Sequence, residues 1–347
     1  MKLIKKLRVA VLYGLICSSN AIGGTYTSVV TKMPSIEAAG ARQDNIGKDS
    51  YLLAIDGKNK SALFLSVMKN EYKYAPINFF SSGRNLIQIS NEFVFSAIDW
   101  DGTCSIRKFT PGNKMEILLL KNNCTAEVFS LSDGFAAWTS EISGQKITFF
   151  NSDGVQKKNV SLINIGKFIT SIASYKSDIY GVSQQNSSDE NLIIFKLEKN
   201  KIVKKLKQIK GAGGQLMSNG EDLIMLFNRN GDPYLIAFDA QLNVKWETQV
   251  TKILRWGTNA SLLVENGRIF FVGGNDGRLY VATFDNHGKK LNEVQDDNMK
   301  YPTPQNGYAV ALMAGKLQIM GVIDEQTNKN GPSTAVVRFF IDMNLNQ

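Results

Sequence analysis

Short runs of apolar residues, bounded by glycine, asparagine and aspartate, cover most of the 347-residue chain. The clearest unit is residues 267–286, in which two aromatic-rich apolar runs flank the sequence GGNDG at 273–277. Residues of these types tolerate the positive φ that a tight turn between two strands requires. The unit therefore predicts a β-hairpin.

Hairpins of this kind recur along the chain at a regular spacing. Gly57, Gly102, Gly144, Gly231, Gly277 and Gly331 lie near corresponding turns, and most steps are 42 to 46 residues when the step from Gly144 to Gly231 counts as two units. That period is the length of one blade of a β-propeller. The other pairs of apolar runs are 51–56 with 62–68, 93–100 with 104–109, 135–142 with 146–150, 178–184 with 192–197, 223–227 with 234–238, and 316–324 with 335–341.

A second turn after each hairpin leads into a fourth, more polar strand, as at residues 115–120, 156–162 and 244–250. The pattern predicts an all-β fold, a seven-bladed β-propeller with four antiparallel strands per blade and little helix. The last unit ends after its third strand, so we expect an N-terminal strand at residues 25–33 to supply the fourth and close the ring. An open array with a spare strand is the alternative. Residues 34–48 predict a polar connector.

The first 21 residues have the three parts of a secretory signal peptide. They contain a basic start with three lysines and Arg8, an apolar run at 9–17, and small residues Ser19 and Ala21 before a cut at Ile22. The apolar run is too short to span a bilayer. A buried N-terminal strand is one alternative, and a lipoprotein signal at Cys17 is another, although Ile16 is large for that signal. We therefore expect a signal peptide at 1–21, a single propeller domain at 22–347, and a periplasmic or secreted protein.

The formal charge of +9 includes four positive charges in residues 1–21, so the mature chain is near +5. This mild bias does not predict nucleic-acid binding. The lysines concentrate in one segment, which favours a solvated outer edge strand over an anion-binding patch. They are Lys196, Lys199, Lys201, Lys204, Lys205, Lys207 and Lys210.

Without the signal peptide two cysteines remain, Cys104 and Cys124. An even number in an exported chain predicts one disulfide. It would close a loop of about 20 residues and contribute about 3 kcal/mol to stability. Two free, buried thiols are the alternative.

The sequence LIAFDAQLNVKW at 235–246 resembles the repeat of the PQQ-like propellers, which has an apolar strand, Ala-x-Asp, a turn and a tryptophan. Residues 281–288 are similar but lack the tryptophan. The resemblance implies a β-propeller of the PQQ-like or WD40-like superfamily, whose folds host enzymes and scaffolds alike. The chain has neither a Cys-x-x-Cys-His sequence nor adjacent cysteines, which puts quinone chemistry in doubt.

Candidate catalytic residues are sparse. His287, the one histidine, lies in a predicted turn, so a Ser-His-Asp triad or a multi-histidine metal site is not expected. Residues 99–102, with two carboxylates, predict a plain turn rather than a calcium loop. Residues 211–214, rich in glycine, predict a connector between blades rather than a phosphate cradle. Carboxylate pairs assembled from different blades would leave no local motif.

The predicted binding surface is the end at which loops between second and third strands emerge together with the connectors between blades. Aromatic and arginine side chains on such loops are frequent interface anchors. Tryptophans buried between blades are the alternative. The residues predicted at this end are Trp100, Asp101, Arg229, Asp232, Arg255, Trp256, Asn275 and Arg278, of which Trp100, Arg255, Trp256 and Arg278 are the expected binding residues.

These observations predict an exported, non-catalytic binding or scaffold protein that mediates protein–protein interaction in the cell envelope or outside the cell. No cofactor, metal, nucleic-acid partner or transmembrane segment in the mature chain is expected. One alternative is an exported carbohydrate-active hydrolase or lyase with carboxylates at the propeller channel. A quinone-dependent dehydrogenase is another.

Overall fold

The computed structural model describes most of the chain as β-strands, and no helix occurs among the described residues. This agrees with the predicted all-β class. The described residues are 17–21, 24–32, 36–41, 51–56, 61–66, 72–76, 80–99, 103–110, 115–122, 124–141, 144–162, 165–185, 191–198, 201–252, 260–275, 278–295, 309–313, 316–325 and 333–342.

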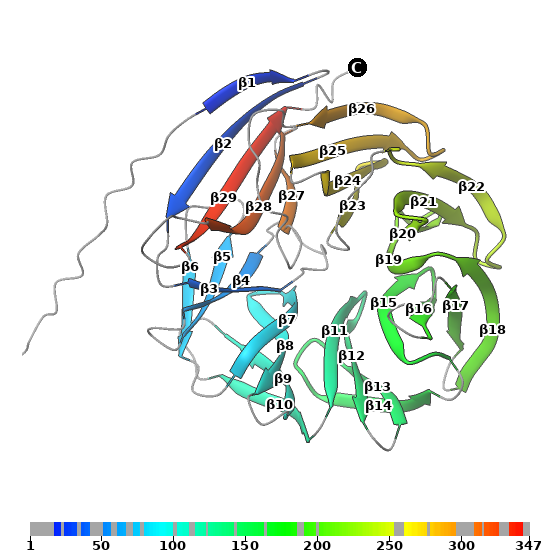
Figure 1. Ribbon diagram of the computed structural model, residues 1–347. Helices are drawn as coiled ribbons and strands as arrows, with labels where there is room; N and C mark the ends of the chain where they lie inside the picture. The colour runs from blue at the N-terminus through cyan, green and yellow to red at the C-terminus, as the bar shows by residue number, and fades with distance from the viewer. Residues whose placement is uncertain are drawn as a thin grey trace, which may run out of the picture.

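The described strands form one five-stranded sheet and six four-stranded sheets, and all of the pairings are antiparallel. Figure 1 shows these sheets side by side around a central axis, with one edge strand of each toward the axis and the other on the outside. Consecutive strands pair within each four-stranded sheet, as expected for a chain of hairpins.

The sheets are numbered here in chain order. Sheet 1 contains β3 (Ile36–Ala41), β4 (Tyr51–Asp56), β5 (Ser61–Ser66) and β6 (Tyr72–Pro76). Sheet 2 contains β7 (Phe80–Ile89), β8 (Glu92–Asp99), β9 (Cys104–Phe109) and β10 (Glu116–Lys121). Sheet 3 contains β11 (Thr125–Leu131), β12 (Gly134–Glu141), β13 (Gly144–Phe150) and β14 (Gln156–Leu162).

Sheet 4 contains β15 (Phe168–Tyr175), β16 (Asp178–Gln184), β17 (Asn191–Glu198) and β18 (Lys201–Lys210). Sheet 5 contains β19 (Ala212–Ser218), β20 (Leu223–Arg229), β21 (Asp232–Phe238) and β22 (Val244–Gln249). Sheet 6 contains β23 (Ser261–Glu265), β24 (Arg268–Asn275), β25 (Arg278–Asp285) and β26 (Lys290–Gln295). The terminal sheet contains β1 (Cys17–Ala21), β2 (Gly24–Lys32), β27 (Ala309–Met313), β28 (Lys316–Glu325) and β29 (Ser333–Asp342).

The terminal sheet joins the two ends of the chain. The strand predicted at residues 25–33 is β2, and it pairs with β29 from Thr25 opposite Asp342 to Lys32 opposite Ala335. Strand β1 lies within the predicted signal peptide and pairs with the outer edge of β2. Without residues 1–21 this sheet would contain four strands, the same number as each of the others.

One expectation for the N-terminal region is wrong. The predicted polar connector at 34–48 contains β3, which pairs with β4 through an irregular register between Glu37 and Ala41. Backbone hydrogen bonds to a neighbouring strand hold such a segment without the apolar alternation that marks an independent strand. The pattern of the sequence alone therefore missed it.

The buried core lies between successive sheets. The cluster between sheets 5 and 6, for example, includes Ile224 and Leu226 of β20 together with Leu262, Ile269 and Phe271 of sheet 6. Equivalent clusters join sheets 2 and 3, sheets 3 and 4, and sheets 4 and 5. Sheets 3, 4 and 5 thus bury both of their faces. Their strands therefore read as continuous apolar runs rather than as a strict alternation.

The same five-residue turn joins the third and fourth strands in sheets 3, 5 and 6. It spans residues 151–155, 239–243 and 285–289, and in each case the first N–H donates to the fifth carbonyl at 3.0 Å. The side-chain oxygen of the first residue also accepts the fifth N–H, at 2.8 to 2.9 Å. The fourth residue has a positive φ: Gly154 at 86°, Leu242 at 63° and Gly288 at 77°.

This turn fastens each sheet to the one before it. In sheet 6, the backbone of Gly288 lies against the ring of Trp246 on β22, and the Trp246 indole N–H donates to the Asn286 carbonyl at 2.8 Å. In sheet 3, Gly154 faces the side chain of Leu118 on β10 in the same way. Trp246 and Leu118 are both the third residue of an outer strand, so the contact repeats with the fold.

The turn at 239–243 makes stability depend on pH. Asp239 accepts hydrogen bonds from the backbone of Gln241 and from the backbone and side chain of Asn243. Burial acts to raise the pKa of Asp239, but the hydrogen bonds from Asn243 and Gln241 outweigh it and lower the pKa. A depressed folded-state pKa adds stability that is complete above the unfolded value and is lost as pH falls through the folded value.

We therefore expect Asp239→Ala to lower the free energy of unfolding by about 1 kcal/mol at neutral pH. The deficit should shrink at pH values below about 3, where the Asp239 carboxyl group of the wild type is protonated and carries no charge. Urea unfolding of both proteins at the two pH values measures it. An equal deficit at both would show that the charge on Asp239 contributes nothing.

Candidate functional site

The candidate site is one end of the sheets, here called the connector rim. Because neighbouring strands are antiparallel, the loops between second and third strands emerge at the same end as the connectors between sheets. Its described parts include residues 103–104, 121–122, 124–125, 141, 144–145, 162, 165–168, 184–185, 191, 210–213, 228–232, 250–252, 273–275 and 278.

The structure describes one of the four predicted binding residues in part. Arg278 is the first residue of β25 and pairs with Asn275 across the turn to β24, which places it on the connector rim. Trp100, Arg255 and Trp256 lie outside the described residues, as does Asp101. Their role in binding remains a prediction.

Arg229, which the sequence also places at this end, is bound within its own sheet. Its guanidinium donates to both carboxylate oxygens of Glu247, at 2.6 and 3.0 Å, and its Nε donates to the Lys210 carbonyl at 3.2 Å. It also lies 5.0 Å and 4.8 Å from the ring centres of Phe227 and Tyr234. The hydrogen bonds that Arg229 donates to Glu247 raise the pKa of Arg229. Its charge is therefore matched inside sheet 5, and its main role is to brace the hairpin between β20 and β21.

Asp232 braces the same hairpin from its other side. Its carboxylate accepts a hydrogen bond from the side-chain amide of Gln249 on β22 at 2.8 Å, and Val250 N–H donates to the Pro233 carbonyl at 2.9 Å. The hairpin is thus tied to the outer strand of sheet 5 along both of its arms. This part of the rim is a rigid support for neighbouring loops.

Phe168 is a rim residue that the sequence reasoning missed. It is the first residue of β15, the inner edge strand of sheet 4, and its side chain is 42% exposed. Lys167 N–H donates to the Gln184 carbonyl at 2.9 Å, so the segment before Phe168 is held to β16. The sequence contains one signal for it. Side chains alternate between the two faces of a strand, so the side chain before the buried Ile169 points away from the core that Ile169 enters.

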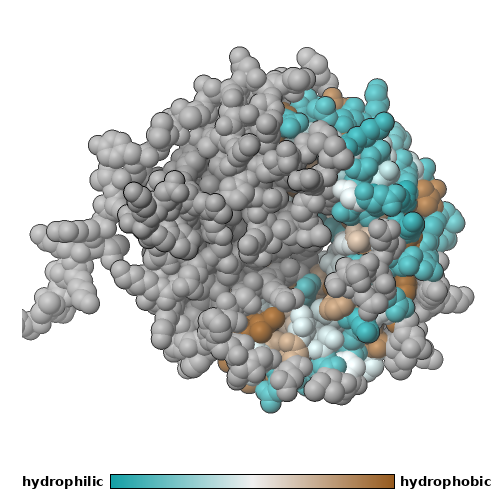
Figure 2. Space-filling model, viewed as in Figure 1, coloured by the Kyte–Doolittle hydropathy of each residue, from teal (hydrophilic) through white to brown (hydrophobic). Residues whose placement is uncertain are grey.

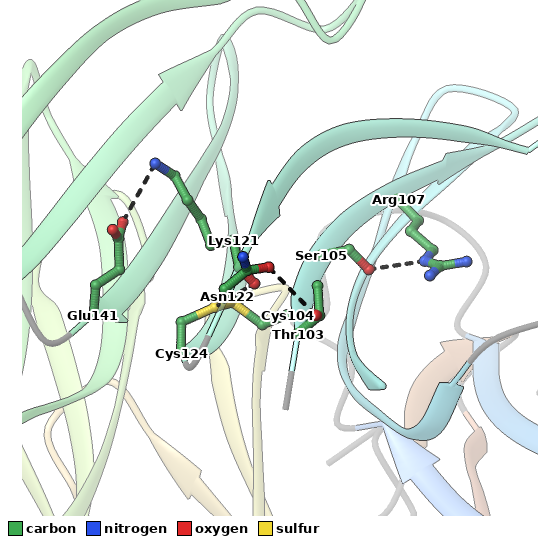
Figure 3. Close-up of a disulfide and its surroundings, with 8 residues drawn as sticks. All are labelled: Thr103, Cys104, Ser105, Arg107, Lys121, Asn122, Cys124 and Glu141. Carbon is green, nitrogen blue, oxygen red and sulfur yellow. Dashed lines mark hydrogen bonds and ion pairs between the residues drawn. A yellow bond between two sulfur atoms is a disulfide. The ribbon is translucent and has the colours of Figure 1, made fainter. Parts of the chain in front are cut away.

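A disulfide between Cys104 and Cys124 fixes the connector rim between sheets 2 and 3, as the sequence predicted (Figure 3). Cys104 begins β9, and Cys124 directly precedes β11, so the bond joins a strand of sheet 2 to the connector that enters sheet 3. The two Cα atoms are 5.6 Å apart, an ordinary disulfide separation.

Polar contacts surround the disulfide. The Thr103 hydroxyl donates to the Asn122 side-chain carbonyl at 3.5 Å, and Lys121 Nζ lies 3.7 Å from Glu141 Oε1 on β12 (Figure 3). The ion pair reaches from the outer strand of sheet 2 to the second strand of sheet 3. Loops carried on this end are therefore positioned by a covalent bond and by contacts between the two sheets.

Most shifted ionisable groups among the described residues belong to pairs within one sheet. Burial, followed by the hydrogen bond to Glu293, raises the pKa of Tyr280. Burial acts to raise the pKa of Glu293, but the hydrogen bonds from Lys290 and Tyr280 outweigh burial, and the pKa is lowered. Asp222 raises the pKa of Lys245, 2.6 Å away. These contacts fasten neighbouring strands and turns, so the shifts have structural causes.

Glu265 is the exception. It is the last residue of β23, an inner edge strand; its side chain is exposed, and the partial burial of its carboxyl group raises its pKa. It lies at the end opposite the connector rim, where β23 turns into β24. His287 is exposed in its turn, and its backbone N–H donates to Asp285 Oδ1 at 2.9 Å. No cluster of three or more histidine, cysteine or acidic residues suited to a metal ion occurs in the described part of the chain. Within that part, no helix is long and apolar enough to cross a bilayer.

The arrangement of four-stranded antiparallel sheets around an axis defines a β-propeller, and solved structures share it. No protein-family model and no curated protein sequence matches the chain. The WD40 domain of Toxoplasma gondii coronin is similar, with a TM-score of 0.53, 8% identity, and coverage of 93% of this chain and 88% of that one. The BP39L lectin of Burkholderia pseudomallei gives a TM-score of 0.58 and 14% identity over 87% of this chain and 99% of that one.

Enzymes also carry this fold. A prolyl endopeptidase structure gives a TM-score of 0.55 and 12% identity over 91% of this chain, which spans 55% of the enzyme's length. The resemblance to β-propellers that residues 235–246 predicted is confirmed at the level of the fold. Identities this low say nothing of what the chain binds or catalyses.

Proposed function

We propose that this chain is an exported, seven-bladed β-propeller that serves as a non-catalytic binding or scaffold module in the cell envelope or outside the cell. The pairing of β2 with β29 supports closure by the N-terminal strand. Removal of a signal peptide at 1–21 would leave four strands in every sheet, and the disulfide suits an oxidising compartment. The mature chain would then be one propeller domain at 22–347.

The proposed binding surface is the connector rim, and the exposed side chain of Phe168 carries the proposal. An aromatic side chain on a rigid support is a frequent anchor of protein interfaces, since it buries much area at little entropic cost. Phe168 is at the same end as Arg278 and the predicted Trp100, Arg255 and Trp256. The WD40 likeness is consistent with a protein-interaction scaffold but does not identify a partner.

The test is crosslinked capture from the native cell envelope with wild-type protein, Phe168→Ser and Trp256→Ala. We expect either substitution to reduce recovery of specific partners roughly tenfold, in line with losses of 1 to 2 kcal/mol at interface anchors. Leu291→Ser is a matched control, because Leu291 is similarly exposed, at 47%, but lies on the outer strand β26. Equal recovery with all four proteins would refute the rim as the binding surface.

A second candidate is an exported carbohydrate-active hydrolase or lyase with carboxylates at the propeller channel. Glu265 is the observation behind it: it ends the inner strand β23, its side chain is exposed there, and its pKa is raised, as that of a general acid is. Incubation with polysaccharides and an assay for released sugar ends distinguishes the candidates. Activity that Glu265→Gln abolishes supports the enzyme, while activity unchanged in that variant would remove Glu265 as its acid.

A further inference from the structure

The outer strand of sheet 2 has an unusual edge. β10 is the last strand of that sheet, and among the described strands it pairs with β9 alone. Its sequence, EILLLK, places four consecutive apolar residues between two charged ends. The side chains of Ile117 and Leu120 are 53% and 54% exposed. Figure 2 shows apolar residues among polar ones along the lower margin of the described surface, the side on which Figure 1 places β10.

The other outer strands with described side chains are protected at their edges. β14 has the sequence QKKNVSL, β22 has VKWETQ and β26 has KLNEVQ, so each carries charged or amide side chains within the strand. Such residues keep an edge strand from pairing with another molecule. None of the four central residues of β10 is polar. Its edge therefore suits the addition of a further strand.

A bulge in β10 brings its two exposed aliphatic side chains to one face of sheet 2. The register on β9 shifts between Ile117 and Leu119, so that Ile117 is opposite Arg107 while Leu120 is opposite Ser105. Arg107 and Ser105 are two residues apart in β9, so they share a face, and their partners on β10 share it too. In a regular strand, residues three apart would lie on opposite faces. The two leucines between the exposed pair pack against the core between sheets 2 and 3.

We propose that β10 is the interface at which two copies of this chain form a two-fold dimer by antiparallel strand pairing. The strand is complementary to itself, because in the reversed direction Glu116 meets Lys121 of the second copy and Ile117 meets its Leu120. A two-fold axis perpendicular to the sheet keeps like faces together, so paired residues must share a face. Glu116 and Lys121 share one face and the two aliphatic residues share the other, as their partners on β9 show. A bulge often blunts an edge, but here it makes both pairs possible.

The charges at the two ends of β10 are only loosely held within one chain. Glu116 Oε2 lies 3.7 Å from Lys108 Nζ, which is closer to Glu92, at 3.3 Å. Lys121 Nζ lies 3.7 Å from Glu141 Oε1. Both separations exceed the roughly 2.8 Å of a charge-assisted hydrogen bond. The side chains of Glu116 and Lys121 are 61% and 37% exposed, so each can also face an opposite charge on a second copy.

This geometry fixes the form of the assembly. A two-fold contact uses the same strand on both molecules, so it closes at two copies and does not grow into a fibre. One pair of strands is a small interface, so we expect the dimer at micromolar rather than nanomolar concentrations. Because the paired strands are antiparallel, the connector rims of the two chains would point in opposite directions. The dimer would thus present one rim at each end.

The test is sedimentation velocity of the purified protein across a range of micromolar concentrations. We expect a reversible shift from the mass of one chain to the mass of two. The double variant Ile117→Lys, Leu120→Lys should remain monomeric, because lysines would then oppose each other across the axis. The matched control is Val244→Lys, Leu291→Lys, at positions 43% and 47% exposed on β22 and β26, which should dimerise as the wild type does.

Charge reversal tests the proposed register. Glu116→Lys alone, or Lys121→Glu alone, places like charges opposite each other at both ends of the strand pair and should weaken the dimer about tenfold. The double variant Glu116→Lys, Lys121→Glu should recover the wild-type affinity. Contacts with Lys108 and Glu141 are lost in the single and double variants alike, so an effect within one chain would not be recovered.

Three results would overturn the proposal. They are a protein that stays monomeric at every concentration, a dimer that tolerates lysine at positions 117 and 120, and a double charge reversal that fails to restore the dimer. A control variant that loses its dimer as fully as the β10 variant would overturn it too, in favour of net charge alone.

Discussion

Gly288→Ala is expected to lower the free energy of unfolding by about 3 kcal/mol. Gly288 has a φ of 77°, which costs an alanine about 1 kcal/mol. A Cβ there would also lie 2.4 Å from Cε3 of Trp246 and 2.8 Å from two further ring atoms. The indole is held by its hydrogen bond to the Asn286 carbonyl, so it cannot move away without losing that bond. Urea unfolding followed by circular dichroism measures the difference.

Gly154→Ala is the matched control. The turn is the same and φ is 86°, but the nearest atoms are the two Cδ atoms of Leu118 at 3.3 Å, which a rotamer change can shift. We expect a loss of about 1 kcal/mol, from the backbone alone. A double-mutant cycle adds a second check: in a Trp246→Ala background, Gly288→Ala should also cost only about 1 kcal/mol. The same cost in both backgrounds would show that Trp246 does not cause the strain.

The repeat could be predicted because its turns depend on local chemistry. Aspartate and glycine at 285 and 288, or asparagine and glycine at 151 and 154, are legible without a structure. The equivalent position in sheet 5 is Leu242, at a φ of 63°, which no turn rule predicts. Its side chain is buried in the core between sheets 4 and 5. That burial offsets the backbone cost, so tertiary packing overrides the local preference here.

The candidate site could be predicted only as a region. The alternation of strand direction places loops at one end, which the sequence reveals, but the contacts of each side chain depend on register. Arg229 on β20 reaches past β21 to pair with Glu247 on β22. This ion pair neutralises the charge of a residue that looked available for binding. Phe168 was missed because a single aromatic residue in an apolar segment resembles a core residue.

Removing the disulfide, by Cys104→Ala with Cys124→Ala, is expected to lower the free energy of unfolding by about 3 kcal/mol. The bond closes a loop with a sequence separation of 20 that contains β9 and β10, so its loss releases chain entropy in the unfolded state. Alanine is preferred to serine because Cys104 is buried, at 1% exposure, and a hydroxyl there would need a partner. Denaturant unfolding in the absence of reductant measures the effect.

The reductant gives the decisive comparison for the disulfide. Wild type unfolded in the presence of dithiothreitol should lose nearly the same stability as the double variant, whereas the variant itself should not respond to the reductant. The loss should also be local in its structural effect, because the hydrophobic cluster between sheets 2 and 3 contains other buried residues, such as Ile106, Val128 and Phe135, that the substitutions leave in place. Hydrogen exchange should therefore rise most at residues 121–125 on the connector rim. A double variant as stable as wild type would mean that packing between sheets 2 and 3, rather than the covalent bond, fixes this end of the molecule.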